Sequence, residues 1–210
     1  MANIEVSSAY DLGIPGERRG EDRTKTTVYR PILFATRSIA GFCLLRNLSA
    51  GGMMGAVYTN LDPGEQVMIE FHPEYVAAGT VAWSYDEKVG VRFDQEIDVS
   101  HTLAVLGRTH SEGWIKRAPR LPLEIEAKAV IEDKPVPIVL HDISQRGIKA
   151  EIPGVRQGDE VSIRLEGLEP HKAIVRWVRG ASSGLNFLRP FGLEELARWA
   201  ISRQNIPAGK

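Results

Sequence analysis

The sequence predicts an all-β fold that consists of two tandem six-stranded β-barrels, each followed by a short α-helix. Three observations predict this fold. The chain repeats itself at an interval of about 95 residues, each copy contains six short strand-like segments, and helical periodicity follows only the sixth segment of each copy. Six strands at regular spacing favour a closed barrel, because closure leaves no sheet edge unpaired.

Four landmarks in the same order establish the duplication. Asn47–Gly52 (NLSAGG) aligns with Asp142–Gly147 (DISQRG) at an offset of 95 residues. Three later pairs of segments share an offset of 94 residues, and they begin at Gly64 and Gly158, Val81 and Val175, and Gly90 and Gly184. Each copy is long enough to be a whole domain, so the repeat is a tandem domain pair and not a solenoid.

Within each copy, runs of β-branched, aromatic or alternating apolar residues are separated by Gly, Pro, Asp and Asn. In the first copy we expect strands over Val28–Ala35, Phe42–Arg46, Met53–Tyr58, Gln66–Phe71, Ala78–Tyr85 and Val89–Phe93. In the second copy we expect them over Leu123–Ile131, Val136–His141, Gly147–Ile152, Glu160–Leu165, Ala173–Val178 and Ser183–Leu188.

Helical patterns follow the last strand of each copy. Val99–Leu106 comes after Asp98, a residue type that caps helices, and Leu193–Gln204 places its apolar side chains on one face. We expect each helix to pack on its own barrel, and the alternative is a helix that binds a partner. The predicted divisions are a flexible N-terminus over 1–15, a first domain over 16–106, a linker over 107–114, a second domain over 115–204 and a tail over 205–210.

Composition limits the classes of partner. Lys plus Arg number 26 and Asp plus Glu number 27, so the formal net charge of −1 does not favour a nucleic acid polymer or an anionic membrane surface. No secretory signal and no apolar run long enough to cross a bilayer are visible, so we expect a cytoplasmic protein without membrane insertion. The single cysteine, Cys43, lies in an apolar run and is expected to be buried.

An arginine-rich segment precedes the first predicted strand. Arg18, Arg19 and Arg23 lie within six positions of each other. The planar guanidinium donates in pairs to phosphate or to the edge of guanine, and it stacks on purine faces. The segment is therefore a candidate anion clamp. The alternative is a solvated charged turn, because acidic residues are interspersed among the arginines.

A second polar segment lies between the second and third predicted strands. Asn47 and Ser49 supply short polar side chains suited to a base edge, and Gly52 allows close approach of the backbone. By itself this segment could equally be an ordinary tight turn.

Together the two segments resemble the PilZ domain family. Its signature is RRxxxR on the arm before the first strand, followed by [D/N]xSxxG on the barrel, and the matching residues here are Arg18, Arg19, Arg23, Asn47, Ser49 and Gly52. The resemblance extends over nearly all of both copies. It implies a bacterial receptor for cyclic di-GMP, a cyclic dinucleotide with two phosphates. The arginines would clamp phosphates and guanine faces, and the barrel motif would meet a guanine edge.

The resemblance also implies that the protein is not an enzyme and signals to an unidentified downstream protein that controls motility, adhesion or exopolysaccharide. The sequence shows no nucleophile elbow, phosphate-binding loop or metal-ligand spacing, so we expect no catalytic residues, no metal and no cofactor other than the ligand. The alternative function is a PilZ-like protein–protein interaction module that works without ligand.

The second copy retains the barrel motif and departs from the arm. Ile115 and Lys116 stand where the paired arginines are expected, whereas Arg120 aligns with the last arginine. Lysine is a point charge and lacks the paired donors of arginine. We therefore expect at most a weak second site, formed by Lys116, Arg120, Asp142, Ser144 and Gly147.

Overall fold

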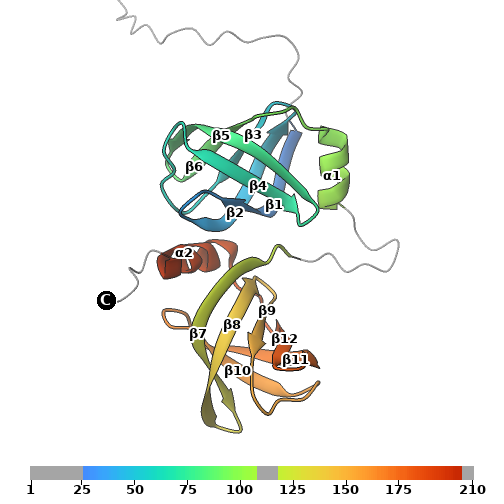
Figure 1. Cartoon of the computed structure of the whole chain (residues 1–210), viewed down its shortest axis with the longest axis vertical. Coiled ribbons are helices and arrows are strands. Elements are labelled where there is room, and N and C mark those ends of the chain that lie inside the picture. The colour runs from blue at the N-terminus through green and yellow to red at the C-terminus, as the bar shows by residue number, and fades with distance from the viewer. Residues whose placement is uncertain (1–25, 108–117, 205–210) are drawn as a thin grey trace, which may run out of the picture.

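The computed structural model of the chain describes residues 26–107 and 118–204, and it contains two closed antiparallel barrels of six strands each (Figure 1). The fold class predicted from the sequence is therefore confirmed. The first barrel consists of β1 (Thr26–Ala35), β2 (Ala40–Ser49), β3 (Gly52–Ala56), β4 (Gln66–His72), β5 (Tyr75–Tyr85) and β6 (Lys88–Phe93), and α1 (Val99–Gly107) follows it. The second consists of β7 (Leu121–Ile131), β8 (Lys134–Ser144), β9 (Gly147–Glu151), β10 (Glu160–Arg164), β11 (His171–Arg179) and β12 (Ser182–Phe187), and α2 (Leu193–Gln204) follows it.

The two barrels close in the same way. In the first, the strands are paired in the order β1-β2-β3-β6-β5-β4, and β4 returns to β1. The second barrel has the corresponding order, in which β10 pairs with β7. Alternate side chains of each strand point inward, because successive residues of a strand face opposite sides of the sheet. On β4, for example, Val67, Ile69 and Phe71 are buried and their neighbours are more exposed.

Strand register makes the two barrels comparable residue by residue. Asn47 pairs with Thr27 on β1, and Asp142 pairs with Pro122 on β7. A register shift precedes Asn47 on β2 and Asp142 on β8, so both barrels carry a bulge at the same place. Residues 95 apart therefore occupy equivalent positions on β1 to β3 and β7 to β9, and Lys88 on β6 is equivalent to Ser182 on β12.

Cys43 lies in the core of the first barrel, as expected from its apolar neighbours. Its side chain is fully buried, and this burial raises the pKa of the thiol to about 12. A thiol with so high a pKa stays protonated at neutral pH and behaves as a small apolar group.

The two helices pack differently. Asp98 caps α1, because its carboxylate accepts a hydrogen bond of 2.9 Å from the backbone N–H of His101, and α1 packs on its own barrel. Figure 1 shows α2 between the two barrels. Its residues Leu196 and Trp199 belong to the core cluster of the second barrel, whereas Ile201 belongs to the core cluster of the first. The expectation that each helix packs on its own barrel is therefore confirmed, and α2 in addition contacts the first barrel, because apolar side chains on this helix face both barrels.

Candidate functional site

Asn47 lies in an open hollow on the outer wall of the first barrel. The hollow has a volume of about 440 Å³ and is formed by residues of four neighbouring strands. Its lining residues are Thr27 and Tyr29 on β1, Arg46 and Asn47 on β2, Met54 and Ala56 on β3, and Lys88 on β6. Asn47 lines the hollow, and among the described residues its side-chain amide has no hydrogen-bond partner.

The hollow is cationic and contains an exposed aromatic ring. The guanidinium carbon of Arg46 lies 4.6 Å from the ring centroid of Tyr29, whose side chain is 59 % exposed. This cation–π contact holds Arg46 over the ring. Within residues 26–107 and 118–204, Lys88 forms one ion pair, an exposed contact of 3.5 Å with Asp86, and exposed pairs contribute little to stability. None of the residues that line the hollow is acidic, so it suits a ligand with both negative charge and flat rings.

Ser49 and Gly52 have structural roles in the turn that follows Asn47. The Ser49 hydroxyl donates a hydrogen bond of 3.1 Å to the carbonyl oxygen of Gly52. A Cβ atom at Gly52 would lie 2.4 Å from the carbonyl oxygen of Val91 on β6, so only glycine allows this approach. The second barrel repeats both features with Ser144 and Gly147. Ser49 and Gly52 therefore fix the β2–β3 connection, and of the three motif residues Asn47 is the one that lines the hollow.

We predict that Gly52→Ala lowers the free energy of unfolding by about 1–3 kcal/mol, because the methyl group forces β3 away from the Val91 carbonyl. Thermal unfolding followed by calorimetry measures the change. Gly107→Ala is the control, since a Cβ atom there meets nothing within 4 Å. Equal stabilities of Gly52→Ala and the parent protein would show that the strands separate without cost.

The three arginines of the predicted arm, Arg18, Arg19 and Arg23, lie outside the described residues, and so does Lys116 of the second arm. The structure therefore brings together only the barrel part of each predicted site. The chain enters β1 at Thr26, directly beside Thr27 in the wall of the hollow. Arg23 precedes Thr26 by three residues, a separation that an extended chain spans in about 10–11 Å.

In the second barrel, the Arg120 guanidinium forms a hydrogen-bonded ion pair with the Asp142 carboxylate. Asp142 is the counterpart of Asn47. Its carboxylate is therefore already paired with an arginine of the same chain, Arg120. Leu121 is equivalent to Thr26, so Arg120 directly precedes the first strand of its barrel.

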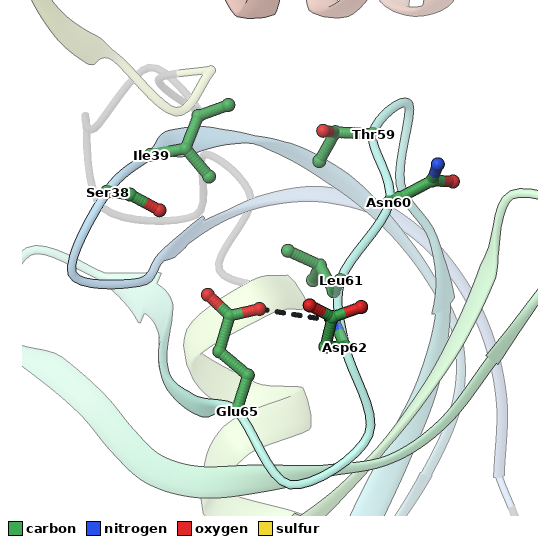
Figure 2. Close-up of a pocket in the computed structure, with 7 residues that line it drawn as sticks. All are labelled: Ser38, Ile39, Thr59, Asn60, Leu61, Asp62 and Glu65. Atoms are coloured by element: carbon green, nitrogen blue, oxygen red, sulfur yellow. Dashed lines mark hydrogen bonds between the residues drawn. The ribbon is translucent and has the colours of Figure 1, made fainter.

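A second hollow, of about 370 Å³, lies at one end of the first barrel (Figure 2). Figure 2 shows Glu65 beside Asp62, whose backbone N–H donates a hydrogen bond of 3.2 Å to the Glu65 carboxylate. The remaining lining residues are uncharged: Ser38, Ile39, Thr59, Asn60 and Leu61. Two carboxylates and no cation make this hollow unsuitable for phosphate, so the hollow around Asn47 is the better candidate for an anionic ligand.

Sequence reasoning missed Tyr29, Arg46 and Lys88. Arg46 directly precedes the motif, and Tyr29 alternates with inward-facing residues of β1, so both could have been suspected. Trp83 is 44 % exposed, and its indole lies across Gly90. In the described residues, no helix is long and apolar enough to cross a membrane, and no cluster of three side chains is arranged to hold a metal ion.

The family model described as the PilZ domain matches the chain twice, over residues 17–108 and 115–199. No curated protein matches the sequence. Among solved structures, PlzA of Borreliella burgdorferi in complex with c-di-GMP is 9 % identical, with coverage of 84 % of this chain and 93 % of that chain and a TM-score of 0.36. The inhibitor of motility from Bacillus subtilis is 13 % identical, with coverage of 85 % and 98 % and a TM-score of 0.34. The K. pneumonia MrkH–c-di-GMP complex is 10 % identical, with coverage of 81 % and 84 % and a TM-score of 0.30.

Proposed function

The chain belongs to the PilZ domain family, and we propose that it is a receptor for cyclic di-GMP whose principal site lies on the first barrel. The observation that carries the proposal is the position of the complete RRxxxR segment. It leads directly into β1, and β1 supplies one wall of a cationic hollow that contains Asn47. We further propose the domain boundaries expected above, with the first domain over 16–106 and the second over 115–204.

The chemistry of the ligand matches the groups available. Cyclic di-GMP carries two phosphodiester charges and two guanine rings. Arg18, Arg19 and Arg23 would donate paired hydrogen bonds to phosphate or stack on guanine, and the Asn47 amide would bond a guanine edge with its donor and its acceptor. Ser49 would act mainly by holding the turn that presents Asn47. A net charge of −1 supports a small nucleotide as ligand better than a nucleic acid polymer.

The second barrel is proposed as a module for protein contacts and not as a strong nucleotide site. Its Asp142 carboxylate is paired with Arg120, and a ligand would have to break this pair before it could use either group. The interaction-module function considered for the whole chain thus fits the second barrel. Binding of ligand to the first barrel would be passed to a downstream protein in the control of motility, adhesion or exopolysaccharide, without catalysis.

Isothermal titration of the full chain with cyclic di-GMP tests the proposal. We expect saturable binding with a dissociation constant in the micromolar range or tighter, which corresponds to a binding free energy of about −8 kcal/mol or more negative. GMP is the matched control, because it carries guanine and phosphate without the cyclic arrangement of two of each. The absence of saturable heat with cyclic di-GMP at about 1 mM would leave the interaction module as the function of the whole chain.

A further inference from the structure

The two barrels carry different side chains at equivalent surface positions. Tyr29, Arg46 and Ala56 in the hollow of the first barrel correspond to Glu124, His141 and Glu151 in the second. Lys88 corresponds to Ser182. Duplication thus provides an internal comparison in which the fold is constant and the side chains differ.

In the second barrel the residues at these positions contact one another, with His141 between two glutamates. His141 Nε2 lies 3.1 Å from a Glu151 carboxylate oxygen, and its Nδ1 lies 3.9 Å from a carboxylate oxygen of Glu124. Asp142 adds a third carboxylate, which is paired with Arg120. A phosphate that approached this face would meet His141 and Ser182 in place of Arg46 and Lys88, beside the carboxylates of Glu124 and Glu151.

We propose that Arg46 and Lys88 form a phosphate-binding pair that extends the nucleotide site beyond the signature motifs, and that Tyr29 positions Arg46 for this role. This inference rests on the proposed binding of cyclic di-GMP. Both cations line the hollow that contains Asn47, so a ligand bonded to the Asn47 amide has its phosphates within the same concavity. The Tyr29 ring holds the guanidinium over its face at 4.6 Å, which reduces the entropy that Arg46 loses when the ligand binds.

The same comparison explains why the second barrel would reject the ligand even with an intact arm. The difference between the barrels would not be confined to Ile115 and Lys116, because the equivalent wall has lost Arg46 and Lys88 and gained the carboxylates of Glu124 and Glu151, while Lys149 replaces Met54. Restoring arginines to the arm alone would therefore recover little affinity.

Calorimetric titration of the full chain with cyclic di-GMP, at several salt concentrations, tests the pair. We expect Arg46→Gln and Lys88→Gln each to raise the dissociation constant about 10- to 100-fold and to reduce its dependence on salt, because each removes one charge-assisted contact. His141→Gln is the control at the matched position of the second barrel, and it should leave affinity and salt dependence unchanged.

Tyr29 needs a separate pair of variants because its role is indirect. Tyr29→Phe keeps the aromatic face and should bind within about twofold of the parent, whereas Tyr29→Leu should weaken binding about two- to fivefold, in line with the loss of an exposed cation–π contact. Arg46→Gln and Lys88→Gln that bind like the parent, with the same salt dependence, would overturn this inference and leave the receptor function intact. A parent protein that does not bind cyclic di-GMP would overturn both.

Discussion

Replacement of both Arg19 and Arg23 by alanine is expected to weaken cyclic di-GMP binding by at least two orders of magnitude. Each arginine would contribute one or more charge-assisted hydrogen bonds, worth about 1.5–3 kcal/mol each. Loss of two such contacts amounts to about 3–6 kcal/mol, and about 1.4 kcal/mol corresponds to a tenfold change in affinity. The unfolding temperature without ligand should barely change, because both residues precede Thr26, where the barrel begins.

Titration calorimetry of the full chain measures the loss of affinity for cyclic di-GMP. Two further variants show whether that loss comes from the arginine side chains of the arm. The pair Arg19→Lys with Arg23→Lys should bind with intermediate affinity, since lysine keeps the charge and loses the paired donors. Arg37→Ala removes an exposed arginine from the β1–β2 turn of the same barrel and should bind like the parent. Parental affinity in the double alanine variant would place the nucleotide site away from the arm.

The fold could be predicted from the sequence because the strands of a barrel alternate between apolar residues that face the core and polar residues that face solvent. Gln66–His72 shows the alternation clearly, and its inward residues Val67, Ile69 and Phe71 are the apolar ones. The duplication supported each predicted strand a second time, because a segment that was ambiguous in one copy could be compared with its counterpart in the other. Strand bounds differ from the prediction mainly at the ends, where hairpin pairing extends beyond the apolar run, as at Ala40 on β2.

The candidate site could be predicted only where it follows a short linear motif. Asn47 was found in this way, whereas Tyr29, Arg46 and Lys88 converge from three different strands. Their convergence depends on the register and on the bulge that contains Arg46. A one-residue change of register moves a side chain to the other face of a sheet, so convergence of this kind is visible only in three dimensions.

The position of α2 was beyond sequence reasoning for a different reason. Periodicity predicted its bounds, Leu193–Gln204, and these are confirmed. Periodicity reveals which residues of a helix are apolar, and it does not reveal what covers them. In this chain the surface that covers Ile201 belongs to the other barrel, and it includes Gly41 on β2.

The contacts of α2 with the first barrel are specific and polar as well as apolar. The Gln204 side chain donates a hydrogen bond of 2.7 Å to the carbonyl oxygen of Ala40 and accepts one of 2.9 Å from its N–H. Arg198 bonds the Glu87 carboxylate at 2.6 Å and lies over the ring of Tyr58 at 5.3 Å. Burial, followed by the negative charge of Glu194, raises the pKa of the Tyr58 phenol, so this ring stays neutral at physiological pH.

We therefore expect Ile201→Asp to separate the unfolding of the two barrels. Ile201 is 7 % exposed and belongs to the core cluster of the first barrel, so the variant places a carboxylate without a partner in an apolar contact. Removal of a buried isoleucine side chain alone costs about 2–5 kcal/mol, and the charge adds to this cost. The parent should unfold in one calorimetric transition, and the variant in two.

Ligand linkage shows whether the two transitions belong to separate barrels. At about 100 times its dissociation constant, cyclic di-GMP bound to the first barrel stabilises that barrel by about 2.7 kcal/mol. In the parent the single transition should shift to higher temperature as a whole. In Ile201→Asp only one of the two transitions should shift, because the barrels would unfold independently and the ligand stabilises only the barrel that binds it. Glu195→Gln, at an exposed position of the same helix, should behave like the parent. A single transition in Ile201→Asp that shifts as in the parent would mean that contacts other than Ile201 couple the barrels.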